Sequence, residues 1–155
     1  MTMEPQKPPT SDSALLIPAR ILDEMVAHCV RDAPLECCGI LGGKDLEVSS
    51  FHPLRNAKSS ETRYEADSTD VINAVIALRG RGAEIVAIYH SHPKWAAVPS
   101  KTDLETNYYG EVPRIIVSLL RPEPEVRIWR LWPDSYKELL WRIAPEGVEP
   151  EGTTG

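Results

Sequence analysis

Apolar residues along the chain form both the runs typical of buried strands and the spacings typical of amphipathic helices. The segment "EIVAIYH" at 84–90 is an almost unbroken apolar and β-branched run, which predicts a strand buried on both faces and therefore central in its sheet. A helix is predicted from Pro18 to about Arg31, because apolar residues recur there at spacings of one, three and four. Its apolar face consists of Ile21, Leu22, Met25, Val26 and Cys29.

The remaining pattern predicts further strands and helices around that central strand. "ECCGILGG" at 36–43 and "LEVSSFHPL" at 46–54 are expected to pair as a hairpin, because glycines and Lys44-Asp45 separate them. This order predicts an α/β fold of the mixed α+β type, with helices flanking one central mixed sheet. The other expected elements are an edge strand at 14–17, a short strand near 63–66, a helix over 69–79 capped by Ser68, a helix from Pro99-Ser100 to Tyr109, and strands at 113–120 and 125–132.

Length and composition narrow the class of protein. At 155 residues the chain is expected to form one domain, over residues 13–144. The proline-rich segment 1–12 and the acidic segment 145–155 are expected to be flexible tails, and the first has none of the features of a secretory signal. No apolar run reaches the 18 or so residues of a membrane span, so a cytoplasmic protein is expected. A net charge of −6 argues against nucleic acid and anionic membranes as partners.

The three cysteines, Cys29, Cys37 and Cys38, include no C-x-x-C pair. They therefore match neither a disulfide framework nor a cysteine zinc site. We expect them to be packing residues, because a free cysteine behaves as a small buried hydrophobe. A bridge between Cys29 and Cys37 is the alternative.

Candidate metal ligands gather in the segment "YHSHPKWAAVPSKTD" at 89–103. His90 and His92 lie two residues apart at the end of the predicted central strand, so their side chains should point to the same face. Asp103, in the first turn of the following helix, is placed to supply a third ligand. Three nitrogen and oxygen ligands leave a fourth zinc position for water, which is typical of a catalytic site.

A structural interpretation competes with the metal site. Ser100 and Asp103 also form the S-x-x-D pattern of a helix capping box, and two histidines at a strand end can be half-exposed polar residues. However, the spacing H-x-H-P, seven residues, then S-x-x-D is far rarer than either of its parts, and this favours the metal site. The two interpretations are compatible, since Ser100 can begin the helix that carries Asp103.

A hydrolytic zinc site also needs a general base, and Glu36 is the leading candidate. It precedes an apolar strand expected beside the central one, where partial burial would raise the pKa of its carboxyl as a general base requires. Glu61 and Glu105 are the alternatives.

Trp95, alone in the loop after His92, has either a packing role or a position facing the substrate. Ser91 is expected to be the small residue that fits between two ligands.

These residues resemble the signature of a known enzyme family. Glu36, "HSHP" at 90–93 and "SKTD" at 100–103 are similar to the E, H-S-H-P and S-x-x-D signature of the JAMM/MPN+ zinc metalloproteases. The resemblance extends over roughly residues 14–132, and no signature position is altered. It is strongest to the compact bacterial and archaeal branch, which includes hydrolases that act on sulfur-carrier proteins.

The resemblance implies a single MPN/JAMM-like domain of cytidine-deaminase-like architecture, and a role for each signature residue. His90, His92 and Asp103 would bind one Zn²⁺ per chain. Glu36 would deprotonate the bound water and then protonate the leaving amine, and Ser100 would stabilise the oxyanion. The expected substrate is an amide bond after the C-terminal glycine of a ubiquitin-like or sulfur-carrier protein that ends in Gly-Gly.

Two other functions are kept as alternatives to this metallopeptidase or isopeptidase. The first is a non-catalytic MPN-type binding or scaffold module, which would have no need of a general base at Glu36. The second is a hydrolase of small peptides, which would share the chemistry and differ in its groove. The chain also has little room for the insertions with which larger deubiquitinases bind a second ubiquitin, and this argues against linkage-specific ubiquitin cleavage.

Overall fold

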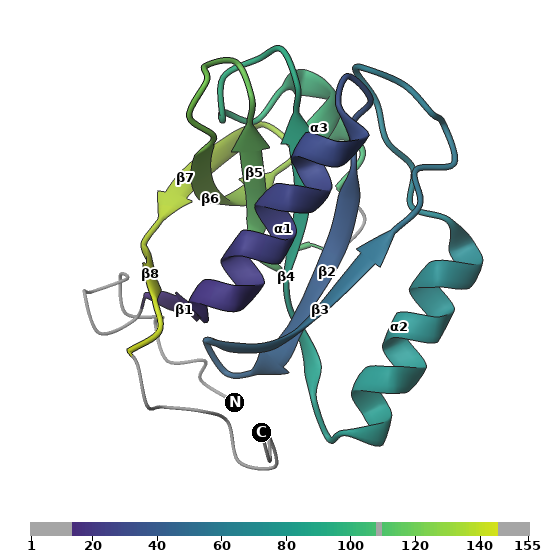
Figure 1. Ribbon diagram of the computed structural model, residues 1–155, viewed down its shortest axis with the longest axis vertical. Coiled ribbons are helices and arrows are strands. Elements are labelled where there is room, and N and C mark those ends of the chain that lie inside the picture. Colours follow the sequence, from purple (N-terminus) through teal and green to yellow (C-terminus); the bar gives the residue numbers. More distant parts are fainter. Residues whose placement is uncertain (1–13, 108–109, 146–155) are drawn as a thin grey trace.

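A computed structural model describes residues 14–107 and 110–145 of the chain (Figure 1). The predicted tails fall outside these residues, apart from position 145. Within them, the elements in chain order are β1 (Leu15–Ile17), α1 (Ala19–Asp32), β2 (Cys38–Lys44), β3 (Glu47–Leu54), α2 (Ser68–Gly80), β4 (Glu84–His92), α3 (Lys101–Glu105), β5 (Arg114–Ser118), β6 (Glu125–Trp132), β7 (Ser135–Leu139) and β8 (Trp141–Ile143).

One mixed sheet forms the centre of the molecule, with the strand order β7-β6-β5-β4-β2-β3-β1-β8. Helix α1 packs on one face through Ile21, Met25 and Cys29, which are fully buried as their spacing predicts. Burial of the Ile21 and Met25 side chains stabilises the fold by about 1.5–3 kcal/mol each. Helix α2 packs on the opposite face through Ala74 and Leu78. The predicted mixed α/β fold with helices flanking a central sheet is therefore confirmed.

Strand β4 is central, as its apolar run predicts. It pairs antiparallel with β2 and parallel with β5. Its side chains alternate between the two cores, so that Tyr89 belongs to the core under α1 and Ile88 to the core under α2. The same alternation places His90 and His92 on the face of Ile88, at the end of the strand. The position of the two histidines thus follows directly from the strand that carries them.

Two local predictions between β3 and β4 are wrong. Ser68 does not cap α2; the helix begins at Ser68, and the side chain of Asp67 accepts a hydrogen bond from the Asp70 N–H instead. The segment 63–66 is not a strand and contributes only a single bridge, between Asn56 and Ala66. The Asn56 side chain bonds to the backbone of this segment at Arg63 and at Glu65, and such bonds replace a strand ladder.

The strand at 14–17 is also not the edge of the sheet, because β8 pairs with β1 on its outer side. Neither β7 nor β8 is predicted, because their residues are mostly exposed and lack an apolar face.

Helix α3 is shorter than expected and ends at Glu105. The Thr106 hydroxyl donates to the Thr102 carbonyl, and side-chain bonds of this kind compete with helix continuation. The predicted end at Tyr109 lies outside the described residues.

The three cysteines are buried free thiols that pack in the two cores, as expected. The Cys29 and Cys37 sulfurs are 3.3 Å apart without a bond between them.

The predicted hairpin of β2 and β3 is present, with Cys38 opposite Leu54. Among the described helices, none has the length and apolar composition needed to cross a membrane.

Candidate metal centre

Three buried side chains meet where β4 ends and α3 begins. His90 Nε2 lies 3.0 Å from Asp103 Oδ1, and His92 Nε2 lies 3.2 Å from Asp103 Oδ2. The two histidine Nε2 atoms are themselves 3.2 Å apart. One ligand atom from each of the three residues lies within 4.8 Å of the others. The structure therefore brings together the three residues that the sequence pattern predicts as metal ligands.

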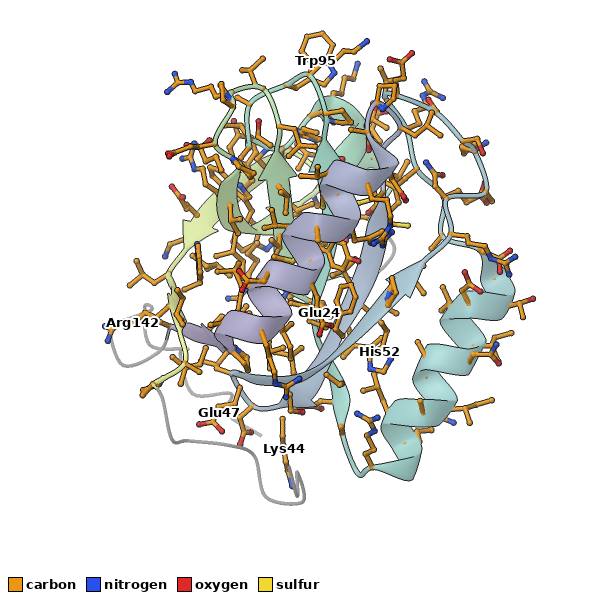
Figure 2. The ribbon with its side chains drawn as sticks, viewed as in Figure 1. Glu24, Lys44, Glu47, His52, Trp95 and Arg142 are labelled. Atoms are coloured by element: carbon orange, nitrogen blue, oxygen red, sulfur yellow. The ribbon has the colours of Figure 1, made fainter. Side chains whose placement is uncertain are left out.

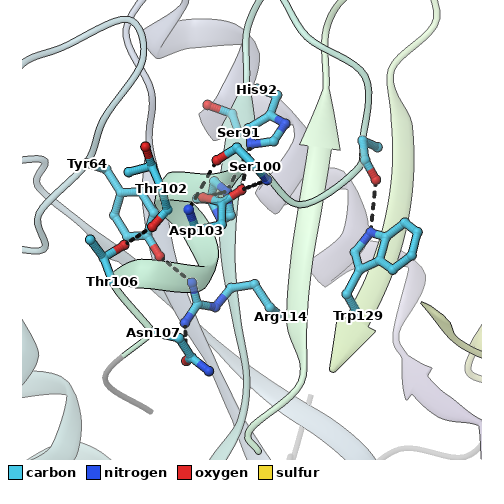
Figure 3. Close-up of polar contacts among 12 residues, drawn as sticks. Tyr64, Ser91, His92, Ser100, Thr102, Asp103, Thr106, Asn107, Arg114 and Trp129 are labelled. Carbon is cyan, nitrogen blue, oxygen red and sulfur yellow. Dashed lines mark hydrogen bonds and ion pairs between the residues drawn. The ribbon is translucent and has the colours of Figure 1, made fainter. Parts of the chain in front are cut away.

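Asp103 also forms the capping box that competes with the metal interpretation. Its backbone N–H donates to Ser100 Oγ at 3.1 Å, and its Oδ2 accepts from the Ser100 N–H at 2.8 Å. Both interactions are drawn in Figure 3. The capping box thus fixes the carboxylate of Asp103 at the angle at which it reaches the two histidines. The two interpretations of "SKTD" at 100–103 describe one arrangement.

Hydrogen bonds and burial set the protonation states of this group. His92 Nδ1 lies 2.8 Å from the carbonyl oxygen of Ala96, and a ring N–H donated there leaves Nε2 with a free lone pair. Burial lowers the pKa of His90, which favours its neutral form. Burial opposes ionisation of Asp103, but the two histidines and the Ser100 N–H hold the pKa of its carboxyl below the usual range. Burial lowers the pKa of His92, but its hydrogen bonds to Asp103 and the Ala96 carbonyl raise it overall, so a bound cation would displace the His92 proton. The two imidazoles and the carboxylate could together hold a divalent metal ion.

Glu36 lies directly beside this group because of the pairing of β2 with β4. Cys38 is opposite His90 in the antiparallel register, and the Ser91 N–H donates to the Cys37 carbonyl. Extending this register by two residues places Glu36 opposite His92, and directly opposed side chains point to the same face. Glu36 is buried. Its two rivals are exposed and paired with lysines, Glu61 with Lys94 and Glu105 with Lys101.

Burial raises the pKa of Glu36 from its ordinary value of 4.5 to about 8; His92 opposes this shift and Asp103 adds to it. A carboxyl in this range exchanges its proton near neutral pH, which suits general acid and base chemistry. The geometry therefore favours Glu36 over Glu61 and Glu105 as the proton carrier beside the three candidate ligands.

A comparison of the sequence with protein families identifies the group to which this arrangement belongs. Residues 18–132 match a family model described as prokaryotic homologs of the JAB domain. The chain belongs to this JAB-domain family. The predicted resemblance to the compact prokaryotic JAMM/MPN+ branch is thus confirmed.

Several relatives within the JAB-domain family are similar over most of the domain. The CysO-cysteine peptidase of Mycobacterium tuberculosis is 35% identical over 120 residues, which are 76% of this chain and 82% of that protein. A Thermus thermophilus protein named "Probable TtuB-protein conjugate cleaving protease" is 41% identical over 92 residues, which are 59% of this chain and 62% of that protein. The solution structure of DSY2949 from Desulfitobacterium hafniense has a TM-score of 0.77 and 28% identity, with 84% of this chain and 93% of that chain covered.

Two serines of this JAB domain lie beside the candidate ligands in different settings. Ser91 is buried between the two histidines, and its Oγ accepts a hydrogen bond from the Cys37 N–H at 2.9 Å. It therefore ties β4 to the segment that carries Glu36. Ser100 is exposed, and its Oγ accepts from the Asp103 N–H. Its own O–H remains able to donate toward a substrate.

Trp95 projects from the loop between the ligands of this JAB domain. Its side chain is 58% exposed, so it has no packing role in the core. Figure 2 shows it pointing outward at the end of the molecule where that loop lies. Its neighbour Lys94 is 2.6 Å from Glu61 across the segment that follows β3. Trp95 is thus available for contact with a bound molecule.

Sequence patterns did not identify two further residues at the centre, Tyr64 and Arg114. The Tyr64 ring stacks on His90 with the ring centroids 4.8 Å apart, and the buried Arg114 donates to the Tyr64 hydroxyl at 2.8 Å. They are 50 residues apart in sequence. No spacing rule links them, and only the folded sheet brings them together.

The pKa of Glu36 predicts how the stability of the metal-free protein depends on pH. Because the folded pKa is raised, the folded state holds a proton between about pH 4.5 and pH 8 that the unfolded chain has released. The protonated Glu36 carboxyl therefore stabilises the folded state fully below about pH 4.5, and this stabilisation is lost as the pH rises to about 8. Glu36→Gln, which is neutral throughout, should therefore gain stability relative to the parent as the pH rises across the window, by about 5 kcal/mol at its upper end.

Urea unfolding of chelator-treated protein at a series of pH values measures this difference. Glu61→Gln is the matched control, because its carboxylate is exposed. Parallel pH curves for the parent and Glu36→Gln would contradict a raised pKa of Glu36.

Proposed function

We propose that this JAB-domain protein is a zinc-dependent peptidase or isopeptidase. Its substrate would be the amide bond that follows the C-terminal glycine of a ubiquitin-like sulfur-carrier protein. The observation that carries the proposal is the buried carboxyl of Glu36, whose pKa responds to His92 and Asp103, beside the cluster of His90, His92 and Asp103. The names of the relatives support the substrate class, because one is a CysO-cysteine peptidase and another a conjugate-cleaving protease.

The cluster of His90, His92 and Asp103 would hold the zinc ion. Two imidazole nitrogens and one carboxylate oxygen are a common ligand set for catalytic zinc, with one position left for water or substrate. When bound, zinc supplies Lewis acidity that polarises a carbonyl and makes a water molecule more acidic. The depressed pKa of Asp103 supports this assignment, because the carboxylate is already ionised.

Glu36 would move the proton. As a carboxylate it accepts a proton from the attacking water, and as a carboxylic acid it returns that proton to the departing amine. The proton thus ends on the leaving group, and the hydroxyl ends on the carbonyl carbon of the terminal glycine. No covalent bond between the protein and the substrate is needed. A raised pKa near 8 keeps both forms of Glu36 accessible at neutral pH.

Ser100 would donate its hydroxyl to the oxyanion that forms during attack. Its Oγ already accepts from the Asp103 N–H, which directs the remaining O–H away from the helix. Ser100→Ala should lower kcat by about 10²-fold, with bound metal and KM nearly unchanged. Ser100→Thr, which keeps both the hydroxyl and the cap, is the control, and steady-state kinetics with metal analysis checks the result. Equal kcat values for Ser100→Ala and the parent would exclude this role.

A cavity beside the ligand cluster could receive the carrier's tail. It has a volume of ≈ 550 Å³, and its lining includes Tyr64, which stacks on His90, and Thr102, which precedes Asp103. A tail ending in glycines is narrow enough to pass close to buried side chains. The exposed ring of Trp95, in the loop that follows His92, offers a second contact.

The test compares two substrates with the same scissile bond. One is a small carrier protein ending in Gly-Gly and fused to a short extension; the other is a peptide of its last residues with the same extension. A carrier hydrolase should cleave the fusion with a much higher kcat/KM than the peptide. Equal rates on both would favour the small-peptide hydrolase, and cleavage of neither by zinc-loaded protein would favour the scaffold module.

A further inference from the structure

The two histidines of the cluster are held in different ways. A histidine that binds a metal usually donates its second ring nitrogen to an oxygen, which fixes the orientation of the ring. His92 follows this rule, because its Nδ1 contacts the Ala96 carbonyl. In contrast, Nδ1 of His90 is buried and has no hydrogen-bond partner among the residues that the structure describes. Another contact must therefore orient the His90 ring.

Tyr64 supplies that contact. Its ring stacks on the His90 ring at a centroid distance of 4.8 Å and an interplanar angle of 24°. A stacked aromatic ring restricts rotation of its neighbour without any hydrogen bond. Tyr64 belongs to the segment between β3 and α2, and Asn56 fixes this segment through its bond to the Arg63 carbonyl at 3.0 Å. The support thus comes from a part of the chain outside the signature segments.

Arg114 holds Tyr64 in turn. One guanidinium nitrogen donates to the Tyr64 hydroxyl at 2.8 Å, and the other donates to Asn107 Oδ1 at 3.0 Å (Figure 3). Arg114 is only 1% exposed and lies on β5, opposite Ile88 of β4. Its planar fork can bind two partners at fixed angles, which a lysine ammonium does not reproduce. The tyrosine ring is therefore clamped between the sheet and its own loop.

We propose that Tyr64 is a positioning residue for metal binding, and that Arg114 acts through it. The stacked ring fixes the His90 imidazole in the orientation that directs Nε2 toward Asp103, in place of the missing hydrogen bond at Nδ1. This inference rests on the proposed zinc site. Tyr64 and Arg114 also line the ≈ 550 Å³ cavity, so the residues that support His90 form part of that cavity's wall.

Zinc affinity of the folded protein tests the proposal. Competition with a chromophoric chelator should show that Tyr64→Leu binds zinc about 10–100-fold more weakly than the parent. Tyr64→Phe, which keeps the stacked ring but loses the hydroxyl that Arg114 holds, should weaken zinc binding less than Tyr64→Leu does and by about as much as Arg114→Lys. The visible absorption bands of the cobalt-substituted protein should change more in Tyr64→Leu than in Tyr64→Phe. Phe51→Leu is the matched control, because Phe51 stacks on Tyr89 and not on a candidate ligand.

A second variant keeps the test decisive if Tyr64→Leu does not fold. Arg114→Lys should weaken zinc binding about tenfold with Tyr64 in place. The double variant Arg114→Lys with Tyr64→Phe should bind zinc no more weakly than Arg114→Lys alone, because the Tyr64 hydroxyl is the group that Arg114 holds. Zinc affinities and cobalt spectra of Tyr64→Leu and Arg114→Lys that match the parent would overturn the proposal while leaving the zinc site intact. A parent protein that binds no zinc would overturn the proposed function and this inference together.

Discussion

Replacing Glu36 with glutamine lowers turnover of a carrier fusion by about 10³-fold and leaves bound zinc in place. Glutamine has nearly the shape of glutamate, but it cannot accept a proton from water or return one to the leaving amine. The burial of Glu36 and its electrostatic interaction with His92 and Asp103 favour it as the carboxyl for both transfers. Because Glu36 is outside the ligand cluster, metal content should not change.

Steady-state kinetics and metal analysis of the same preparation check this result. Glu61→Gln and Glu105→Gln are the controls, since each removes an exposed carboxylate that is paired with a lysine. Both controls should keep turnover within about threefold of the parent. Unchanged turnover in Glu36→Gln would remove the main support for an enzyme and favour a scaffold module.

Replacing His92 with alanine abolishes both zinc binding and cleavage. The variant leaves two of the three candidate ligands, and a single imidazole and carboxylate hold zinc far more weakly. It also removes the ring whose Nδ1 contacts the Ala96 carbonyl. Metal content measured by mass spectrometry should fall from about one zinc per chain to background, and kcat should fall to the rate of chelator-treated parent.

His52→Ala is the control for this loss, because His52 lies on β3 and contacts Ser50 and not the cluster. It should keep both zinc and activity. A His92→Ala protein that retains full activity would show that the cluster is not the catalytic centre. Circular dichroism of both variants separates loss of the metal from loss of the fold.

The core of the site is predictable from sequence because its geometry is local. Two histidines at a spacing of two on a buried strand must share a face, and the structure places both on the Ile88 side of β4. The capping pattern at Ser100 fixes Asp103 within one helical turn. Physical argument from the sequence leaves three carboxylates open as the general base. Burial and the electrostatic interaction with His92 and Asp103 favour Glu36 among them.

Other features depend on contacts that no local pattern encodes. The stack of Tyr64 on His90 and its bond to Arg114 join three separate segments through the folded sheet. The predicted strand around Tyr64 fails because Asn56 side-chain bonds to Arg63 and Glu65 organise that segment. Strand β8 forms although only Trp141 is partly buried, because β1 offers it a free edge. These elements are determined by their partners more than by their own sequence.

The intact mass of a treated carrier fusion tests the central claim most directly. The parent is stripped with a chelator, divided, and incubated with the fusion before and after zinc is restored. The account predicts that only the zinc-restored sample yields a carrier fragment whose mass ends at its own C-terminal glycine, together with the free extension. An uncleaved fusion after zinc is restored, cleavage at another bond, or equal cleavage in the stripped sample would contradict it.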